Sequence, residues 1–534
     1  MPGLVVLAVT MGASVVGCAP ATVRTPQPAA SPAASNLASP AWSPVLPTIA
    51  ARPSPAVPPT AASYILPIVP VVGFWVTAKS ISTTELTRLW LAGGGPGAST
   101  LPYETLYVDT AAHRAMTELV AAGPGAAVQV VTTDRVKAAV TSSSSVIGLI
   151  AADDVTPDVR AVAIDGRSLF GPGRVTDATL WPLRLMTDSR PAFSPAAEWT
   201  LAAGGDVNLD RRVYTASIGR GNGVNWPWSG GSAVVKSISC CGFDGAAIPF
   251  ARQTGNPGVV SAILRGSDLA IVNLEGSAPD DWVYRPNSLI FTFDPELLAG
   301  LRNAGIDAVS LANNHIGNDG PAGVIATCRN VAAAGLEHAG AGATPSAARS
   351  PAWLSAGDLK VALLAYTAVA GGWVSAARAG AAPLRIDEVT ADIRAAKAAG
   401  AHLVIVMPHW GTEYSRFVGA DQKREAAAMV SAGADLVLGS HSHWAGAIAS
   451  IARPTGPAFI DYSMGDFLFD LNHDVWSDEG VILEFSFVGT RLAQVRLQPT
   501  VMVDGAQIGL LDPAGDGAAE LAAIRRASRG LLGW

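Results

Sequence analysis

Several apolar, strand-like runs in the second half of the chain end on a residue that is able to bind a metal ion. The runs occupy residues 199–206, 269–275, 308–315, 403–409, 436–443 and 459–466, and they end on Asp206, Glu275, His315, His409, His443 and Asp466. In α/β sheets, functional sites assemble in the loops at the carboxyl ends of the strands. The pattern therefore predicts that a sheet brings these side chains together at one edge.

The length and the composition favour a folded protein with more than one domain. A chain of 534 residues exceeds the usual limit for a single core, so we expect two domains and additional tails. Hydrophobic residues make up 49% and charged residues 15%, which argues against disorder over most of the length. The net charge of −7 gives no electrostatic reason to expect a nucleic-acid partner.

The first 18 residues are typical of an export signal. Residues 1–17 are apolar or small and form a run too short for an ordinary membrane-spanning helix. The run ends in Val15-Val16-Gly17-Cys18, which resembles the lipobox of bacterial lipoproteins, where the cysteine is lipidated. No Lys or Arg precedes it, so an ordinary signal peptide, cleaved or retained, is the alternative. We expect an extracytoplasmic protein that is anchored to the cell membrane through a lipid at Cys18.

Residues 19–63 are rich in Pro, Ala, Ser and Thr and have almost no charge. Such a segment cannot bury enough apolar surface to offset its ordering entropy, so it is predicted to be an extended linker. The cysteines beyond it, Cys240, Cys241 and Cys328, lack a Cys-x-x-Cys spacing. They indicate neither a thiolate zinc site nor a dense disulfide framework, and a disulfide from Cys328 to one of the adjacent pair stays open.

Residues 64–191 form a block with its own α/β pattern. Strand-like runs at 64–72, 127–131 and 145–150 alternate with a helix signal at Ser82-Thr-Thr-Glu85, which has the spacing of a capping box. The block resembles one lobe of phosphate-type periplasmic binding proteins, on the motifs Ile81-Ser-Thr-Thr-Glu-Leu, Ser145-Val-Ile-Gly-Leu-Ile, Val162-Ala-Ile-Asp-Gly and Trp181-Pro-Leu. Those proteins need two lobes to enclose a ligand, so a structural or protein-docking module is the favoured interpretation over ligand binding.

Residues 197–503 show a β-α-β rhythm, which predicts a layered α/β core. Helical stretches at 295–305, 389–400 and 424–433 each end at a glycine, as a left-handed C-cap would. The runs from Gly480 and Ala493 predict an antiparallel hairpin. In the tail, residues 504–534, the sequence indicates one short amphipathic helix at 518–526.

Four of the eight histidines lie at the strand ends: His315, His409, His441 and His443. A single buried histidine is more often a satisfied core group, but four beside Asp and Glu favour a metal site. Imidazoles with carboxylates suit Mn, Fe or Zn, and two such ions could activate a water and clamp a phosphoryl group. The chain has no glycine-rich phosphate loop and no Gly-x-Ser-x-Gly motif, so metal-activated water is the simplest nucleophile.

Taken in order, these motifs resemble the CapA, or poly-γ-glutamate capsule biosynthesis, family of the calcineurin-like metallophosphoesterase superfamily. The matching stretches are 205–211, 273–275, 310–315, 334–342, 409–414, 439–443 and 463–467. The resemblance implies a four-layer αββα sandwich for residues 197–503, preceded by the smaller α/β lobe.

The resemblance also implies roles for individual residues and two divalent metal ions of unknown identity. Asp206 and His443 would hold one ion, with Asn314, His409 and His441 on the other and Glu275 between them. His315 would be the general acid, and Glu413 could orient His409. Arg211 would contact an anion, and a surface salt bridge is the alternative.

Three positions depart from the family pattern. The superfamily's first motif is commonly Asp-x-His, whereas Asn208 follows Asp206 here, so one metal is expected to be held less tightly. Asn318 stands where an aspartate usually follows the Asn-Asn-His motif. Asp466 replaces the asparagine of a Gly-Asn-Phe motif, and it is either a further ligand or, as we favour, a loop cap.

Two functions from different classes follow. The first is an exported hydrolase of phosphoester-type bonds that acts on an envelope or capsule component. The second is a non-catalytic component that binds an anionic polymer within a capsule-synthesis membrane complex and keeps the fold. The set of four histidines favours catalysis, because a scaffold has no need for a general acid beside metal ligands.

Overall fold

The computed structural model describes residues 63–91, 103–240, 247–286, 288–471 and 474–533. The export signal with Cys18 and the linker therefore lie outside the described residues. Cys328 is a free thiol, and the side chains of Cys240 and Cys241 lie outside the described part. None of the described helices is both long enough and apolar enough to cross a membrane.

The first part of the described chain forms a mixed sheet with the strand order β4-β3-β5-β1-β6, and β8 also pairs with β1. The strands are β1 (Tyr64–Gly73), β3 (Thr105–Val108), β4 (Val128–Val130), β5 (Val146–Ala151), β6 (Val159–Ala161) and β8 (Arg184–Thr187). The other elements are the paired strands β2 (Ser80–Ile81) and β7 (Ala163–Ile164), and the helices α1 (Thr83–Leu91), α2 (Thr110–Val120) and α3 (Thr133–Ser142). The strands predicted here are confirmed as β1, β4 and β5. The cap is also present, because Ser82 Oγ accepts a 3.0 Å hydrogen bond from Glu85 N.

A second, ten-stranded sheet has the order β11-β10-β26-β25-β24-β9-β12-β13-β14, with β23 beside β9. Its strands are β9 (Glu198–Val207), β10 (Ser232–Cys240), β11 (Ala247–Gly255), β12 (Leu269–Leu274), β13 (Ala308–Ser310), β14 (Glu337–Ala339), β23 (Asp466–Leu468), β24 (Glu479–Val488), β25 (Arg491–Val503) and β26 (Gln507–Leu510). Strands β9, β12, β13 and β14 run parallel, so their carboxyl ends meet at one edge. The predicted hairpin is confirmed as β24 and β25, which pair antiparallel.

A third, six-stranded sheet has the order β16-β17-β19-β20-β22-β21. Its strands are β16 (Ala352–Ala356), β17 (Leu359–Thr367), β19 (Leu403–His409), β20 (Leu436–Leu438), β21 (Ile448–Ile451) and β22 (Ala458–Asp461). Strands β17, β19, β20 and β22 are parallel, and the short strands β15 (Ala341–Gly342) and β18 (Gly380–Ala381) form a separate pair. The third sheet thus presents a second set of parallel strand ends.

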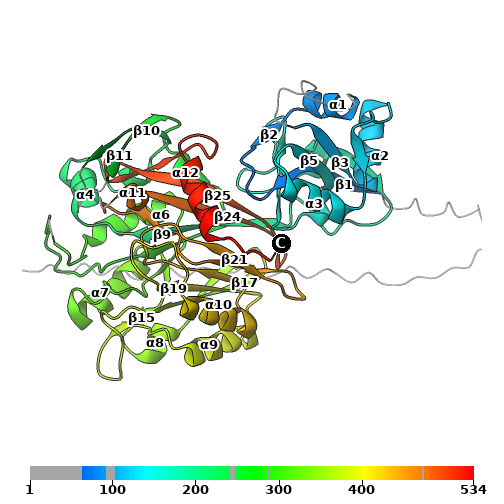
Figure 1. Ribbon diagram of the computed structural model, residues 1–534. Helices are drawn as coiled ribbons and strands as arrows, with labels where there is room; N and C mark the ends of the chain where they lie inside the picture. Colours follow the sequence, from blue (N-terminus) through cyan, green and yellow to red (C-terminus); the bar gives the residue numbers. More distant parts are fainter. Residues whose placement is uncertain (1–62, 92–102, 241–246, 287, 472–473, 534) are drawn as a thin grey trace, which may run out of the picture. The chain divides into compact units, whose positions relative to one another are not determined.

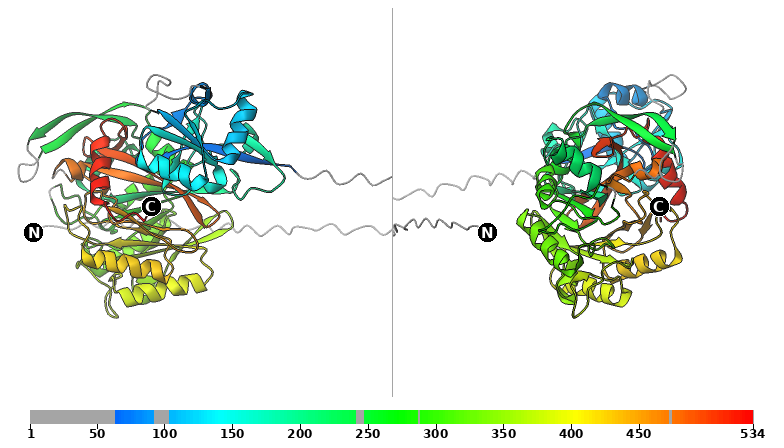
Figure 2. Two further views of the ribbon diagram at one scale, coloured as in Figure 1. Left: turned by 45° about the vertical axis from the view of Figure 1, so that its right-hand side comes forward. Right: turned by 90° about the vertical axis from the view of Figure 1, so that its left-hand side faces the viewer.

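The second and third sheets pack face to face between two layers of helices, which confirms the expected four-layer αββα sandwich (Figure 1, Figure 2). Alternation along β19 shows the layering. Leu403 and Ile405 lie in the core between the sheets, whereas Val404 and Val406 pack toward helices. On that outer side lie α9 (Ile386–Ala398) and α10 (Ala420–Ala432), and on the other outer side lie α5 (Val259–Gly266), α6 (Leu298–Ala304) and α7 (Gly320–Ala333).

The remaining helices are short segments and a C-terminal helix. They are α4 (Arg211–Tyr214), continued by a π-helix (Thr215–Gly219), α8 (Pro345–Arg349), α11 (Val475–Asp478), α12 (Ala518–Ala527) and the 3₁₀ helices at Ala152–Asp154, Ala178–Leu180, Trp226–Trp228 and Pro295–Leu297. The predicted glycine ends are confirmed, since Gly305, Gly400 and Gly433 have φ values of 102°, 88° and 120°. The tail helix is also confirmed, as α12.

Two neighbouring carboxyl groups at the junction of α11 and β24 are buried without full hydrogen bonding. Asp478 and Glu479 are each 4% exposed, and one carboxylate oxygen of each has no hydrogen-bond partner among the described residues. Burial raises the pKa of both groups to about 8. The folded protein therefore keeps these two protons at pH values where the unfolded chain has released them, since carboxyl pKa values in an unfolded chain are about 4.

We expect the metal-free protein to lose stability as the pH rises from about 4 to about 8. In this window the folded state binds more protons than the unfolded state, so each group lowers the unfolding free energy by about 1.4 kcal/mol per pH unit. The substitution Asp478→Asn should flatten the decline, and Asp280→Asn, at an exposed position, should not. Thermal unfolding at about pH 5 and about pH 8 measures the slope, and an equal slope in both variants would contradict the prediction.

Candidate metal centre

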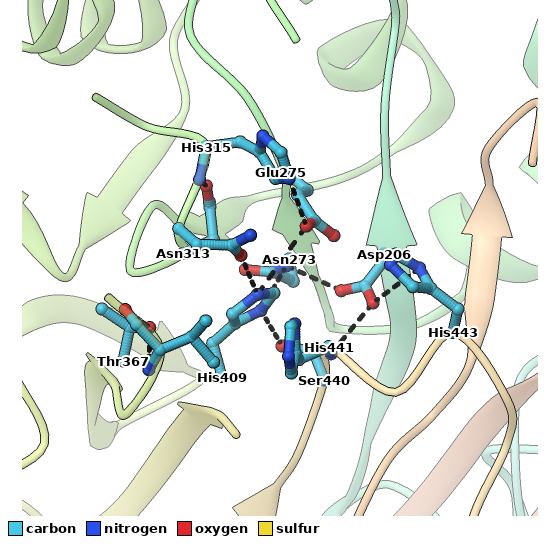
Figure 3. A network of polar contacts seen from close by, with 12 residues as sticks. Asp206, Asn273, Glu275, Asn313, His315, Thr367, His409, Ser440, His441 and His443 are labelled. Carbon is cyan, nitrogen blue, oxygen red and sulfur yellow. Dashed lines mark hydrogen bonds and ion pairs between the residues drawn. The ribbon is translucent and has the colours of Figure 1, made fainter. Parts of the chain in front are cut away.

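The carboxyl ends of strands from both large sheets converge on one site (Figure 3). From the second sheet, β9 contributes Asp206, and Glu275 directly follows β12. From the third sheet, β19 ends with His409, and the turn after β20 carries His441 and His443. The structure thus brings together residues that lie more than two hundred positions apart, as the strand-end pattern predicted.

The first group of ligand atoms comprises Glu275, His409 and His441. One atom from each of these buried side chains lies within 4.8 Å of the others. Asn314 belongs to the same group, because its Oδ1 is 2.7 Å from His409 Nε2. Both carboxylate oxygens of Glu275, as well as His441 Nδ1, lack a hydrogen-bond partner among the described residues. Buried, unsatisfied polar atoms of these types are what a divalent cation would satisfy.

The second group comprises Asp206, His443 and Asp466, again within 4.8 Å of one another. His443 Nδ1 lies 2.8 Å from Asp466 Oδ1 and 3.8 Å from Asp206 Oδ2. Asp466 Oδ2 is buried without a hydrogen-bond partner among the described residues, and no described backbone N–H donates to this carboxylate. The favoured interpretation of Asp466 as a loop cap is therefore not supported. The residue instead belongs to the group of candidate ligands.

Asn208 supports the loop around the site rather than the site itself. Its Nδ2 donates to the carbonyl oxygen of Glu275 at 3.1 Å, and its Oδ1 accepts from Asp210 N at 2.9 Å. Both ends of the amide are thus used. Since Asp466 pairs with Asp206 between the parallel strands β23 and β9, the chain places a carboxylate at the second group although position 208 offers no imidazole.

The side chains that hold the candidate ligands in place differ from those expected. Ser440 Oγ lies 2.9 Å from His409 Nδ1 and so orients the ring, whereas Glu413, predicted for that role, is exposed and forms no hydrogen bond with His409. Asn273 donates through Nδ2 to Asp206 Oδ1 at 2.7 Å. Sequence reasoning missed both contacts, although Asn273 and Ser440 belong to the quoted motifs, because hydroxyl and amide partners depend on how the strands pack.

Burial and crowding shift the pKa values at this site. Burial raises the pKa of Glu275 well above its usual value, and the charge of Asp206 raises it further. Burial also raises the pKa of Asp466, to about 7. Burial lowers the pKa of His443, but Asp466 and other carboxylates raise it by more, to about 10. Protonated His443 offsets part of the repulsion between these carboxylates, and a divalent cation bound here would take over that role.

The turn that carries the two histidines has unusual backbone geometry. His441 and His443 have φ values of 95° and 58°, in the region that residues other than glycine rarely adopt. A hydrogen bond of 3.0 Å from His441 N to Asp206 Oδ2 helps to hold this conformation. Backbone strain of this kind persists only where the surrounding structure enforces it, and it is concentrated at functional sites.

His315 lies at the exposed edge of the site, with its side chain 20% exposed. Its Nε2 is 3.9 Å from Glu275 Oε1, and the ring packs against Phe291 at an interplanar angle of 40° with the ring centroids 4.1 Å apart. Asn318 Oδ1 accepts from Phe291 N at 2.7 Å and lies 2.9 Å from His315 Nδ1. Because this oxygen can only accept, it favours the tautomer with a proton on Nδ1. Burial lowers the pKa of His315 to about 4.

Arg211 lies beside His315 but is not free. Its Nε donates to Asp470 Oδ1 at 2.9 Å, its second terminal nitrogen also contacts that oxygen, and the guanidinium stands 4.9 Å from the Phe291 ring centroid. The side chain is 14% exposed, so the pair with Asp470 is a partly buried salt bridge rather than a surface one. The remaining terminal nitrogen, Nη1, forms only a long hydrogen bond of 3.5 Å to Ser288 O. The predicted contact of Arg211 with an anion stays a prediction.

Comparisons with known proteins agree with the resemblance of the motifs. A family model described as bacterial capsule synthesis protein PGA_cap matches residues 200–471. Capsule biosynthesis protein CapA of Bacillus anthracis is 29% identical over 220 residues, which are 40% of this chain and 53% of that protein. PGA biosynthesis protein CapA of Bacillus subtilis (strain 168) is 28% identical over 215 residues, covering 40% of this chain and 56% of that protein.

The chain spans about half the length of these curated relatives. Among solved structures, the calcineurin-like phosphoesterase YfkN from Bacillus subtilis is similar with a TM-score of 0.28 and 11% identity, covering 61% of this chain and 99% of that chain. The match to the family model extends over half of the 534 residues, from Thr200 within β9 to beyond Asp466. The chain therefore belongs to the bacterial capsule synthesis protein family PGA_cap.

Proposed function

We propose that this chain is an exported, metal-dependent hydrolase of phosphoester-type bonds that acts in the synthesis of a capsule or envelope polymer of the poly-γ-glutamate kind. The observation that carries the proposal is the pair of adjacent buried ligand groups with a separate histidine, His315, at their exposed edge. Family membership supports the link to capsule synthesis. The proposed substrate chemistry follows from the site rather than from the names of the relatives, because the chain covers only about half of each relative.

Two divalent ions would be held by the two groups. Glu275, Asn314, His409 and His441 would hold one ion, and Asp206, His443 and Asp466 the other. Glu275, whose two carboxylate oxygens lack hydrogen-bond partners among the described residues, would have one oxygen available for each ion. When bound, such ions supply Lewis acidity and lower the pKa of a water molecule so that it can attack a phosphoryl group.

The chain's own residues position the substrate and move a proton. Phe291 and Asn318 fix the His315 ring with Nδ1–H directed to Asn318 and Nε2 directed to the site, so that the ring, once it carries a second proton on Nε2, is placed to donate that proton to the leaving oxygen. Arg211, held by Asp470 over the Phe291 ring, would contact an anionic group of the substrate through Nη1. Hydrolysis then needs no covalent intermediate with the protein.

Elemental analysis combined with an assay of aryl phosphate hydrolysis tests this function. We expect about two Mn, Fe or Zn ions per chain and turnover of 4-nitrophenyl phosphate that stops after chelation and returns when metal is added. Purified protein that binds no divalent metal and hydrolyses neither phosphomonoesters nor phosphodiesters would refute the proposal.

A second function is favoured by the names of the family and of the relatives, which concern capsule synthesis rather than hydrolysis. In this case the chain would bind the anionic polymer as part of a membrane complex. Binding of poly-γ-glutamate by metal-free protein, unchanged by His315→Gln, would support this function over catalysis.

We also propose that the protein is attached to the outer face of the cell membrane through a lipid at Cys18. The substitution Cys18→Ala is expected to abolish incorporation of a labelled fatty acid, because the thiol is the site of acylation. Since one acyl chain binds membranes only marginally, wild-type protein should carry more than one chain. Equal labelling of wild type and Cys18→Ala would contradict the anchor, and Cys328→Ala, at a partly buried thiol, is the matched control.

A further inference from the structure

The loop that follows β19, residues 410–419, forms one wall of the second ligand group. Tyr414 N donates to Ser442 O at 2.8 Å, so the loop is bonded to the turn that carries the histidines. The Tyr414 ring stacks on the ring of His443 with the centroids 5.8 Å apart, and Phe469 forms an edge-to-face contact with that imidazole at 5.2 Å. Tyr414 has a φ of 57°, a conformation that must be enforced by its surroundings. The position of the His443 ring therefore depends on this loop.

Arg416 connects the loop to the C-terminal helix α12. Its two terminal nitrogens donate to Glu520 Oε1 and Oε2 at 2.8 Å and 2.6 Å, in a bidentate pair. The Glu520 side chain is fully buried, and that of Arg416 is 11% exposed. Arg416 also donates to the carbonyl oxygen of Ala445, two residues after His443. One guanidinium thus joins the loop, the histidine turn and α12.

Two tryptophan side chains, one in α11 and one in the turn after His443, pack against the Arg416 guanidinium. Its central carbon lies 4.7 Å from the centroid of the Trp476 ring in α11 and 5.8 Å from that of Trp444. Arginine is suited to this position because its planar group forms two parallel hydrogen bonds and stacks on rings at the same time. Lysine would keep the charge and lose this geometry.

The C-terminal segment is firmly attached to the third sheet, so it can act as a fixed point. Ile524 of α12 belongs to the core between the two sheets. Ser528 Oγ accepts from Ile448 N at 2.9 Å, and Gly533 N donates to Ser450 Oγ at 2.7 Å, which ties the segment to β21. In Figure 1, α12 is the red helix beside β25. The tail is thus linked through Glu520 and Arg416 to the loop whose Tyr414 ring stacks on His443.

We propose that Arg416 and Glu520 are positioning residues through which the C-terminal helix sets the His443 ring and thereby the affinity of the second metal position. The inference rests on the metal centre of the proposed function. It predicts a selective effect, because the loop that the pair anchors contacts His443 through the Tyr414 ring, whereas the pair forms no hydrogen bond with Glu275, His409 or His441 among the described residues. An ion pair that only stabilised the fold would affect both positions alike.

The test is a metal titration of Glu520→Gln by calorimetry with Mn²⁺, followed by elemental analysis after dialysis. We expect the first equivalent of metal to bind as in wild type and the second to bind roughly 10 to 100-fold more weakly, the range for lost supporting contacts. Hydrogen exchange of metal-free protein should become faster in residues 411–419. Arg416→Lys, which keeps the charge, should give a smaller change in both measurements.

Asp392→Asn is the matched control, because it breaks a bidentate pair with Arg349 at 2.8 Å and 2.8 Å on the outer helical layer. It should lower the unfolding temperature without changing either metal affinity. If Glu520→Gln behaves like this control and leaves exchange of the loop unchanged, the proposal is overturned. Wild-type protein that binds two ions but hydrolyses nothing would refute the hydrolase function alone, since the titration does not depend on turnover. Should Glu520→Gln fail to fold, Arg416→Lys provides the same two measurements.

Discussion

The substitution His441→Ala is expected to remove bound metal and to lower the rate of phosphoester hydrolysis on the order of 10³-fold or more. His441 lies in the group with Glu275 and His409, and its Nδ1 has no hydrogen-bond partner among the described residues, so coordination is the role left for this buried ring. A metal ion contributes several kcal/mol to stabilising the transition state, and about 4 kcal/mol corresponds to a factor of about 10³. Elemental analysis and turnover of 4-nitrophenyl phosphate measure the two effects.

His402→Ala is a suitable control for this experiment. His402 lies in the exposed loop before β19, where its Nδ1 accepts a hydrogen bond of 2.8 Å from Lys360 N. The control should retain metal and activity because it removes an imidazole from the same region of the chain without touching the site. If His441→Ala keeps two ions and wild-type turnover, the first ligand group is not a metal site.

The sequence predicted the convergence of ligands because parallel strands share the direction of their carboxyl ends. Asp206, Glu275, His409, His441 and His443 are all fixed by that rule, and the structure places them together. A layered α/β core followed from the alternation of strand and helix patterns, whereas the four-layer αββα arrangement was implied by the family resemblance. For the ligand convergence and the layered core, the local sequence pattern is enough for the prediction, because it agrees with the topology of the folded sheets.

Asp466 shows what the sequence pattern could not supply. Its place beside Asp206 depends on the pairing of β23 with β9, strands that are about 260 residues apart in the chain. A loop-capping role was favoured from the local Gly-Asp-Phe motif, yet the carboxylate lies 2.8 Å from His443 Nδ1. Short motifs describe the backbone around a residue, whereas ligand identity depends on which distant strand becomes the neighbour.

The salt bridges near the site illustrate the same limit. Arg211 pairs with Asp470 and Arg416 with Glu520, across separations of 259 and 104 residues. Neither partner has a distinctive spacing, and each acidic residue would otherwise read as a solvated surface group. Pairing of this kind is decided by packing, which sets the desolvation that an unpaired charge would suffer.

The substitution His315→Gln is expected to leave both metals in place and to reduce hydrolysis in a manner that depends on the leaving group. General acid catalysis contributes roughly 10² to 10⁴-fold when the leaving oxygen needs a proton. We therefore expect a loss of that order for an alkyl phosphate and a much smaller loss for 4-nitrophenyl phosphate, whose leaving group departs as a stable anion. The ratio of kcat/KM for the two esters, compared between wild type and variant, measures the effect.

This comparison separates a proton donor from a residue that only shapes the site. A ring that merely packed against Phe291 would, when replaced, lower the rates for both esters by the same factor, since positioning does not depend on the basicity of the leaving oxygen. His338→Gln, at a partly buried histidine of β14 away from the site, should change neither rate. Equal losses for the two esters would remove His315 from the proton-transfer step and leave catalysis to the metal centre alone, because no other described imidazole lies at the exposed edge of the two ligand groups.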